Sequence, residues 1–104
     1  MPEETFTTGS VQLEEEDTQI GHPPLFAVVF FNDDYTPMEF VVHVLQKFFG
    51  RSADEATQIM LNVHQRGVGV CGVYSFEIAE SKAQKTIDHA RKNDHPLQLQ
   101  LEKE

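Results

Sequence analysis

The sequence has little cysteine and few basic residues, and each shortage argues against a class of function. Its single cysteine, Cys71, cannot form a disulfide within one chain, and no cysteine pair has the spacing of metal ligands. Lys and Arg number eight against 17 Asp and Glu, which gives a formal net charge of −9. Because nucleic-acid phosphates are bound mainly by Lys and Arg, this balance argues against a nucleic-acid partner. It equally argues against a polybasic membrane anchor.

Long hydrophobic runs are also missing. No apolar stretch approaches the roughly 18 residues expected of a membrane helix. Residues 1–4 lack both the basic region and the apolar region of a signal peptide. We therefore expect a cytoplasmic protein without a membrane partner, and we expect it to need neither a cofactor nor a metal ion.

The acidic charge is concentrated at the start of the chain. Residues 1–24 carry six of the 17 acidic residues and none of the basic ones, and residues 14–17 form a self-repelling block. A segment of this kind cannot bury enough apolar area to offset its chain entropy. We predict a disordered acidic extension over residues 1–24 and one core domain over residues 25–104, which is large enough to fold alone.

The core is predicted to begin with a buried strand followed by a helix. Residues 25–31 are an unbroken apolar run, rich in β-branched and aromatic side chains, which favours a strand buried on both faces. Thr36 as N-cap, Pro37 as first helical residue and Glu39 as partner in a capping box predict a helix start, and Gly50 predicts its end. The expected inner face of this helix consists of Met38, Val41, Val42, Leu45, Phe48 and Phe49.

A second helix, a strand and a third helix follow. Ser52 and Glu55 predict another capping box, and Gly67 predicts the end of that helix. Residues 68–73 are typical of a strand whose glycines allow another backbone to come close. Ser75 is predicted to be the N-cap of the third helix. The expected buried side of that helix consists of Ile78, Ala79, Ala83, Thr86, Ile87 and Ala90.

The last element is a half-buried strand over residues 97–101, where Leu and Gln alternate after a turn at residues 93–96. The resulting order is β-α-α-β-α-β. It predicts an α+β protein, a two-layer sandwich with three helices on a small, three-stranded, mainly antiparallel sheet.

Catalysis is not indicated. The sequence has no Gly-rich phosphate loop, no nucleophile elbow and no histidine pair at metal-binding spacing. Cys71 lies in a Gly- and Val-rich strand and is interpreted as a small core residue rather than a nucleophile. Asp33 and Asp34 are adjacent on extended chain, so their side chains point apart and do not form an acid–base pair. A small-molecule enzyme that uses Asp33 or Cys71 is therefore the weakest hypothesis.

Residues 32–38 are the most informative segment. Asn and Asp are common in strand-to-helix turns, so a simple turn is one interpretation. The other is a binding site, because the amide and carboxylates lie next to the flexible Met38. Met60, Val63 and His64 share one face of the second helix and can face the same spot. By themselves, the two methionines also fit core filling and His64 fits an ordinary surface position.

An acidic rim over an apolar hole suits a ligand in which a positive charge is attached to a hydrophobic side chain. The free N-terminus of a peptide has this chemistry. Its α-ammonium carries three N–H donors, and Asn32, Asp33 and a neutral His64 can supply acceptors.

Several segments resemble a known family. They are residues 32–41 (NDDYTPMEFV), 60–64 (MLNVH), 67–73 (GVGVCGV), 79–82 (AESK) and 95–97 (HPL). They are similar to the Clp-protease adaptor (ClpS) family, whose members deliver N-degron substrates to an AAA+ unfoldase. The resemblance spans about residues 23–104, and the acidic segment matches only as a variable extension.

The resemblance implies roles for individual residues. Asn32, Asp33 and His64 are expected to hold the substrate's α-ammonium, with Asp34 in the same acidic rim. Met38 is expected to act as a gate that excludes β-branched Val and Ile. The positions that match the pocket wall are Thr36, Val41, Met60, Val63 and Leu97.

The implied function is that of a monomeric, non-enzymatic adaptor. It would bind proteins that begin with Leu, Phe, Tyr or Trp and present them to a Clp-type AAA+ unfoldase–protease. Glu77 and Lys82 match the surface that docks on the unfoldase's N-terminal domain. The alternative is an interaction module that inhibits or redirects the unfoldase through its acidic segment without reading N-termini.

Overall fold

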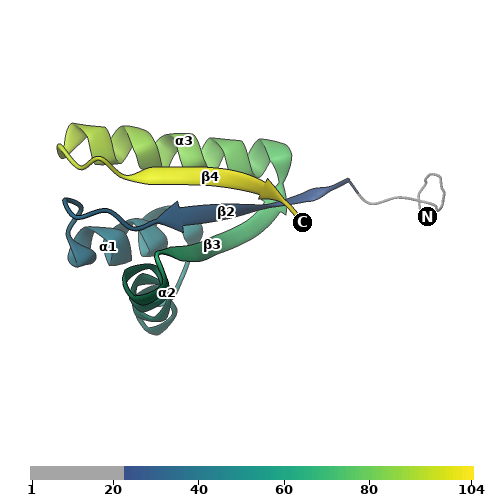
Figure 1. Cartoon of the computed structure of the whole chain (residues 1–104). Helices are drawn as coiled ribbons and strands as arrows, with labels where there is room; N and C mark the ends of the chain where they lie inside the picture. Colours follow the sequence, from purple (N-terminus) through teal and green to yellow (C-terminus); the bar gives the residue numbers. More distant parts are fainter. Residues whose placement is uncertain (1–22) are drawn as a thin grey trace.

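The computed structural model describes residues 23–104. Its elements are strand β2 (Leu25–Phe31), helices α1 (Met38–Phe49) and α2 (Ala53–Arg66), strand β3 (Val68–Ser75), helix α3 (Phe76–Lys92) and strand β4 (Gln98–Lys103). The three helices pack on one antiparallel sheet with strand order β3-β2-β4 (Figure 1). The predicted fold class and element order are confirmed. The prediction of a disordered acidic extension falls almost entirely on residues 1–22, which lie outside the described residues.

Strand β2 occupies the centre of the sheet because its residues are apolar on both faces. Val28 and Phe30 are at most 1% exposed and belong to the core that the helices share. Ala27 and Val29, which alternate with them, are also buried. The predicted burial on both faces is confirmed for these four residues. Because β3 and β4 pair with β2 along both edges up to Phe31, the position of the end of β2 is fixed relative to both neighbouring strands.

The pairing of β2 with β3 contains one irregularity. Its register shifts between Val28 and Val29, where Cys71 is the extra residue on β3. Such a bulge leaves backbone groups without a ladder partner. Here the Cys71 carbonyl accepts a hydrogen bond from Nε of Arg51 at 2.9 Å. The Cys71 side chain is fully buried, and burial raises the pKa of its thiol to about 12, in agreement with a core role.

The N-terminus of α1 differs from the prediction. Pro37 is the N-cap, and no side chain caps this helix. The predicted box between Thr36 and Glu39 is wrong, because the Thr36 hydroxyl donates instead to Oδ2 of Asp33 at 2.8 Å. The predicted helix end is confirmed, since Gly50 adopts the left-handed conformation with φ 63°.

The predicted ends of α2 are both confirmed. Ser52 and Glu55 form a complete capping box, with N···O distances of 3.0 and 3.1 Å. The hydrogen bonds from the backbone and side chain of Ser52 hold the pKa of Glu55 below its ordinary value. Gly67 ends the helix with φ 87°.

Close packing of α2 on β3 depends on Gly69. A Cβ atom at this position would lie 2.7 Å from Cγ2 of Val63 and 3.2 Å from the carbonyl oxygen of Ile59. The expectation that a strand glycine allows another backbone to approach is therefore confirmed here.

Helix α3 follows the prediction with two differences. Ser75 is the N-cap, but its side chain makes no capping hydrogen bond. Ile78 was expected on the buried side and is instead 51% exposed, because Ala79 occupies the inward position beside it. The fully inward residues are Ala79, Ala83, Thr86 and Ala90. No helix among residues 23–104 is long and apolar enough to cross a membrane.

The burial of Cys71 predicts that its thiol is unreactive in the folded protein. At mildly alkaline pH, labelling with a thiol-specific disulfide reagent should be about three orders of magnitude slower than for an ordinary cysteine, because very little thiolate forms. The same chain in guanidinium chloride is the control and should label promptly. Rapid labelling of the native protein would contradict the buried placement.

Candidate functional site

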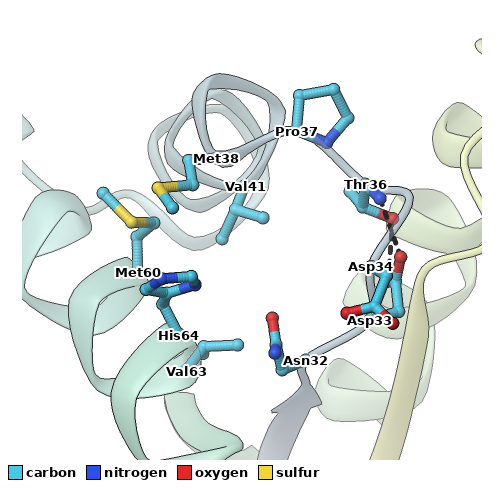
Figure 2. A pocket seen from close by; sticks show the side chains of 10 residues that line it. All are labelled: Asn32, Asp33, Asp34, Thr36, Pro37, Met38, Val41, Met60, Val63 and His64. Atoms are coloured by element: carbon cyan, nitrogen blue, oxygen red, sulfur yellow. Dashed lines mark hydrogen bonds between the residues drawn. The ribbon is translucent and has the colours of Figure 1, made fainter.

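A cavity of about 310 Å³ opens where β2 ends, between the loop that follows it and the facing sides of α1 and α2 (Figure 2). This volume lies at the lower end of the range for small-ligand pockets. It therefore suits a group of the size of one amino-acid side chain. The lining residues are Asn32, Asp33, Asp34, Thr36, Pro37, Met38, Val41, Met60, Val63 and His64.

The loop before α1 is organised by the carboxylate of Asp33. Its Oδ1 accepts the backbone N–H groups of Tyr35 at 2.8 Å and Thr36 at 2.7 Å, while its Oδ2 accepts the Thr36 hydroxyl at 2.8 Å. The turn interpretation is thus confirmed for Asp33. It is compatible with the binding interpretation, because a carboxylate oxygen that accepts one hydrogen bond has a further lone pair available.

Asn32 joins the two sides of the cavity. Its backbone N–H donates to the carbonyl of Gly67 at 3.0 Å, which ties the end of β2 to the end of α2. Its side-chain amide points into the cavity from below in Figure 2. The imidazole of His64, from α2, lies across the cavity from the carboxylates of Asp33 and Asp34.

The remaining wall is apolar and comes from two helices. Met38 and Val41 lie three positions apart on α1, and Met60 and Val63 have the same spacing on α2, so each pair shares a helix face. Val41 and Val63 are buried, whereas Met38 is 43% exposed at the mouth. In Figure 2 the thioethers of Met38 and Met60 approach each other on the side opposite the carboxylates.

The cavity therefore combines polar acceptors on one side with an apolar wall on the other. Two carboxylates in this position attract a cation, and an unbranched thioether adapts to the shape of an apolar group. A ligand that fits both sides carries a positive charge next to a bulky hydrophobic substituent.

The structure brings together nine of the ten residues predicted to bind the ligand. The exception is Leu97, which is buried and borders a separate hollow beside β4, together with Phe31 and His95. Leu97 belongs to the same core cluster as Val41 and Val63, and its place in the pocket wall stays a prediction. Pro37 was missed, although its place between the predicted site residues Thr36 and Met38 was an available signal.

The two predicted docking residues lie on α3, outside the lining of the cavity. Glu77 is exposed in the first turn of the helix. Lys82 is half-buried, and its Nζ donates to the carbonyl of Phe48 at 2.9 Å and lies 5.2 Å from the ring centre of Tyr74. Lys82 therefore binds the C-terminal end of α1.

Residues 21–100 match the family model described as ATP-dependent Clp protease adaptor protein ClpS. The chain belongs to the ClpS family. It is 61% identical over 82 residues to the ATP-dependent Clp protease adapter protein ClpS of Gluconobacter oxydans, covering 79% of this chain and 69% of that one. It is 54% identical over 96 residues to the corresponding protein of Caulobacter vibrioides, covering 92% and 88%.

A solved structure of another family member has the same fold. Agrobacterium tumefaciens ClpS2, determined bound to L-phenylalaninamide, superimposes with a TM-score of 0.77 at 38% identity. The match covers 80% of this ClpS family member and the whole of the other chain.

The Asp33 loop predicts a measurable role for the Thr36 hydroxyl. Thr36→Val removes one hydrogen bond to a carboxylate while keeping the side-chain shape, and should lower the free energy of unfolding by about 1 to 2 kcal/mol in urea. Thr36→Ser keeps the hydroxyl and is the matched control. Equal stability of Thr36→Val and the parent would show that this hydrogen bond does not hold the loop.

Proposed function

We propose that this ClpS family member is a substrate adaptor that binds the free N-terminal residue of N-degron proteins and delivers them to a Clp AAA+ unfoldase–protease. One observation carries the proposal: a cavity of single-residue size has amide, carboxylate and imidazole groups facing an apolar wall. The ligand of the Agrobacterium relative supports it, because phenylalaninamide presents an ammonium beside a bulky apolar side chain.

In this proposal the ammonium lies between Asn32, Asp33 and His64. The Asn32 amide oxygen and a neutral His64 nitrogen accept two of its three N–H groups, and Oδ2 of Asp33 can accept the third. Asp34 is exposed at the rim and adds negative charge without needing a direct contact.

The first side chain of the substrate lies against Met38, Val41, Met60 and Val63. A flexible methionine at the mouth admits Leu, Phe, Tyr and Trp, which are unbranched at Cβ. Val and Ile carry a second substituent at Cβ, directly beside the ammonium, and meet the gate before they can enter.

The expected affinity suits an adaptor that must release its cargo. Burying one Leu or Phe side chain contributes about 1.5 to 3 kcal/mol. Each charge-assisted hydrogen bond contributes roughly 1.5 to 3 kcal/mol. After losses of translational and side-chain freedom, the sum corresponds to a dissociation constant around micromolar or somewhat tighter.

Docking on the unfoldase's N-terminal domain is assigned to α3, with Glu77 as the exposed charged contact. Lys82 contributes to the same docking surface while its ammonium remains hydrogen-bonded to the backbone carbonyl of Phe48. The adaptor acts as a monomer and performs no reaction of its own.

The proposal predicts that a free α-amino group is essential. A fluorescent peptide that begins with Phe should bind in an anisotropy titration, and its N-acetylated twin should bind at least about 100-fold more weakly, because acetylation removes the charge and two donors. Equal binding of the two peptides would overturn the proposal.

A second test separates this adaptor from the alternative inhibitory module. In a degradation assay with the unfoldase and protease, an N-degron substrate should be degraded faster with the adaptor present, and Asn32→Ala should abolish that gain. If Asn32→Ala leaves delivery unchanged, the alternative, in which N-termini are not read, is favoured.

The proposal also predicts that the His64 imidazole contributes to binding. His64→Ala removes one acceptor of the ammonium, so the Phe peptide should bind about tenfold more weakly in the same anisotropy titration. Unchanged affinity would show that His64 does not contact the amine.

A further inference from the structure

Three histidines, one of them more than 40 residues before the other two, gather around one phenylalanine. His43 on α1, His89 on α3 and His95 in the following turn all lie near Phe40. The ring of Phe40 stacks on His89, with centroids 5.4 Å apart and an angle of 14° between the planes. Phe48 meets His89 edge-on at 5.5 Å. None of these residues lines the cavity described above.

Two of the three imidazoles face each other across the contact between α1 and α3. The Nε2 atoms of His43 and His89 are 3.3 Å apart. In the metal-free protein this distance fits an N–H···N hydrogen bond, in which one ring donates and the other accepts.

The same distance fits two ligands of one metal ion. Zinc–imidazole bonds are about 2.0 to 2.1 Å long, and the tetrahedral angle between two of them places the nitrogens about 3.3 to 3.4 Å apart. The two side chains therefore need little rearrangement to chelate an ion. Phe40 and Phe48 already hold the ring of His89 in its orientation.

Two positively charged side chains lie near the pair. Lys47 and Lys92 are close enough to His89 to act on it electrostatically, and they repel a dication. Affinity therefore depends on the two imidazole nitrogens binding the ion together.

We propose that His43 and His89 form a bidentate site for a late first-row divalent metal ion, such as zinc, nickel or copper, which links α1 to α3. Imidazole nitrogen suits these ions, whereas magnesium and calcium prefer oxygen ligands. No group of three or more His, Cys, Asp or Glu side chains within residues 23–104 is arranged to hold a metal, so water fills the other positions. On binding, the N–H···N hydrogen bond is exchanged for two N–metal bonds, and the donor ring carries its proton on Nδ1 instead.

Calorimetric titration of the full chain with zinc or nickel chloride tests this site. The parent should bind, and His43→Gln should bind about tenfold or more weakly, because it loses one of two ligands. His95→Gln is the matched control, since it removes a histidine from the same cluster and should bind within about twofold of the parent. Magnesium chloride should give no binding.

His43→Gln is the decisive variant because His43 is exposed, whereas His89 also packs on Phe40. Urea unfolding in a chelator should show that His43→Gln remains folded. Substoichiometric zinc should shift the imidazole proton signals of His43 and His89 in NMR spectra before those of His64.

Three results would overturn the proposal. The first is the absence of zinc and nickel binding by the parent. The second is unchanged affinity in His43→Gln, which would place the ion elsewhere. The third is an equal loss in His95→Gln and His43→Gln, which would show that the ion does not bind the His43–His89 pair as assigned.

Discussion

Strand β2 must be buried on both faces, and the rest of the structure is arranged around this constraint. Its apolar run requires a paired strand along each edge and helices over the face that carries Val28 and Phe30. The polar residues begin immediately after the buried run, so they emerge at a single point of the sheet. At that point α1 starts and α2 ends, and the cavity lies between them.

In the loop after β2, Asp33 and Asn32 each make hydrogen bonds within the protein and also present a polar group to the cavity. Asp33 binds two backbone N–H groups and one hydroxyl of the loop, which holds the carboxylate in place before a ligand arrives. Asn32 uses its backbone to reach Gly67 and leaves its side chain facing the cavity. A site that is held in this way loses less freedom on binding, so more of the contact energy appears as affinity.

Local sequence patterns predicted the elements well where one interaction dominated. The Ser52–Glu55 box and the glycines at the ends of α1 and α2 depend on neighbouring residues alone, and all are as predicted. The capping role of Thr36 was predicted wrongly because the capping pattern considers only Thr36 and Glu39. It does not take account of the Asp33 carboxylate, which accepts a hydrogen bond from the Thr36 hydroxyl.

Features that depend on packing between distant elements could not be predicted from local sequence patterns. The resemblance implied that Leu97 belongs to the pocket wall; its side chain is buried in the core beside a separate hollow next to β4, and its role in binding stays a prediction. Spacing along the chain showed no histidine pair suited to a metal, yet the contact of α1 with α3 brings His43 and His89 to 3.3 Å. Most of the cavity was predictable because its residues come from two short motifs and the resemblance related them to each other.

The central claim is that the end of β2 presents acceptors to an ammonium while α1 and α2 hold the adjoining side chain. A crystal structure of this chain with phenylalaninamide tests it most directly. The account predicts the ligand's amino nitrogen within about 2.7 to 3.2 Å of the Asn32 amide oxygen and a His64 nitrogen, with the phenyl ring between Met38 and Val63. An amino group that faces solvent, or a ring bound outside this cavity, would contradict it.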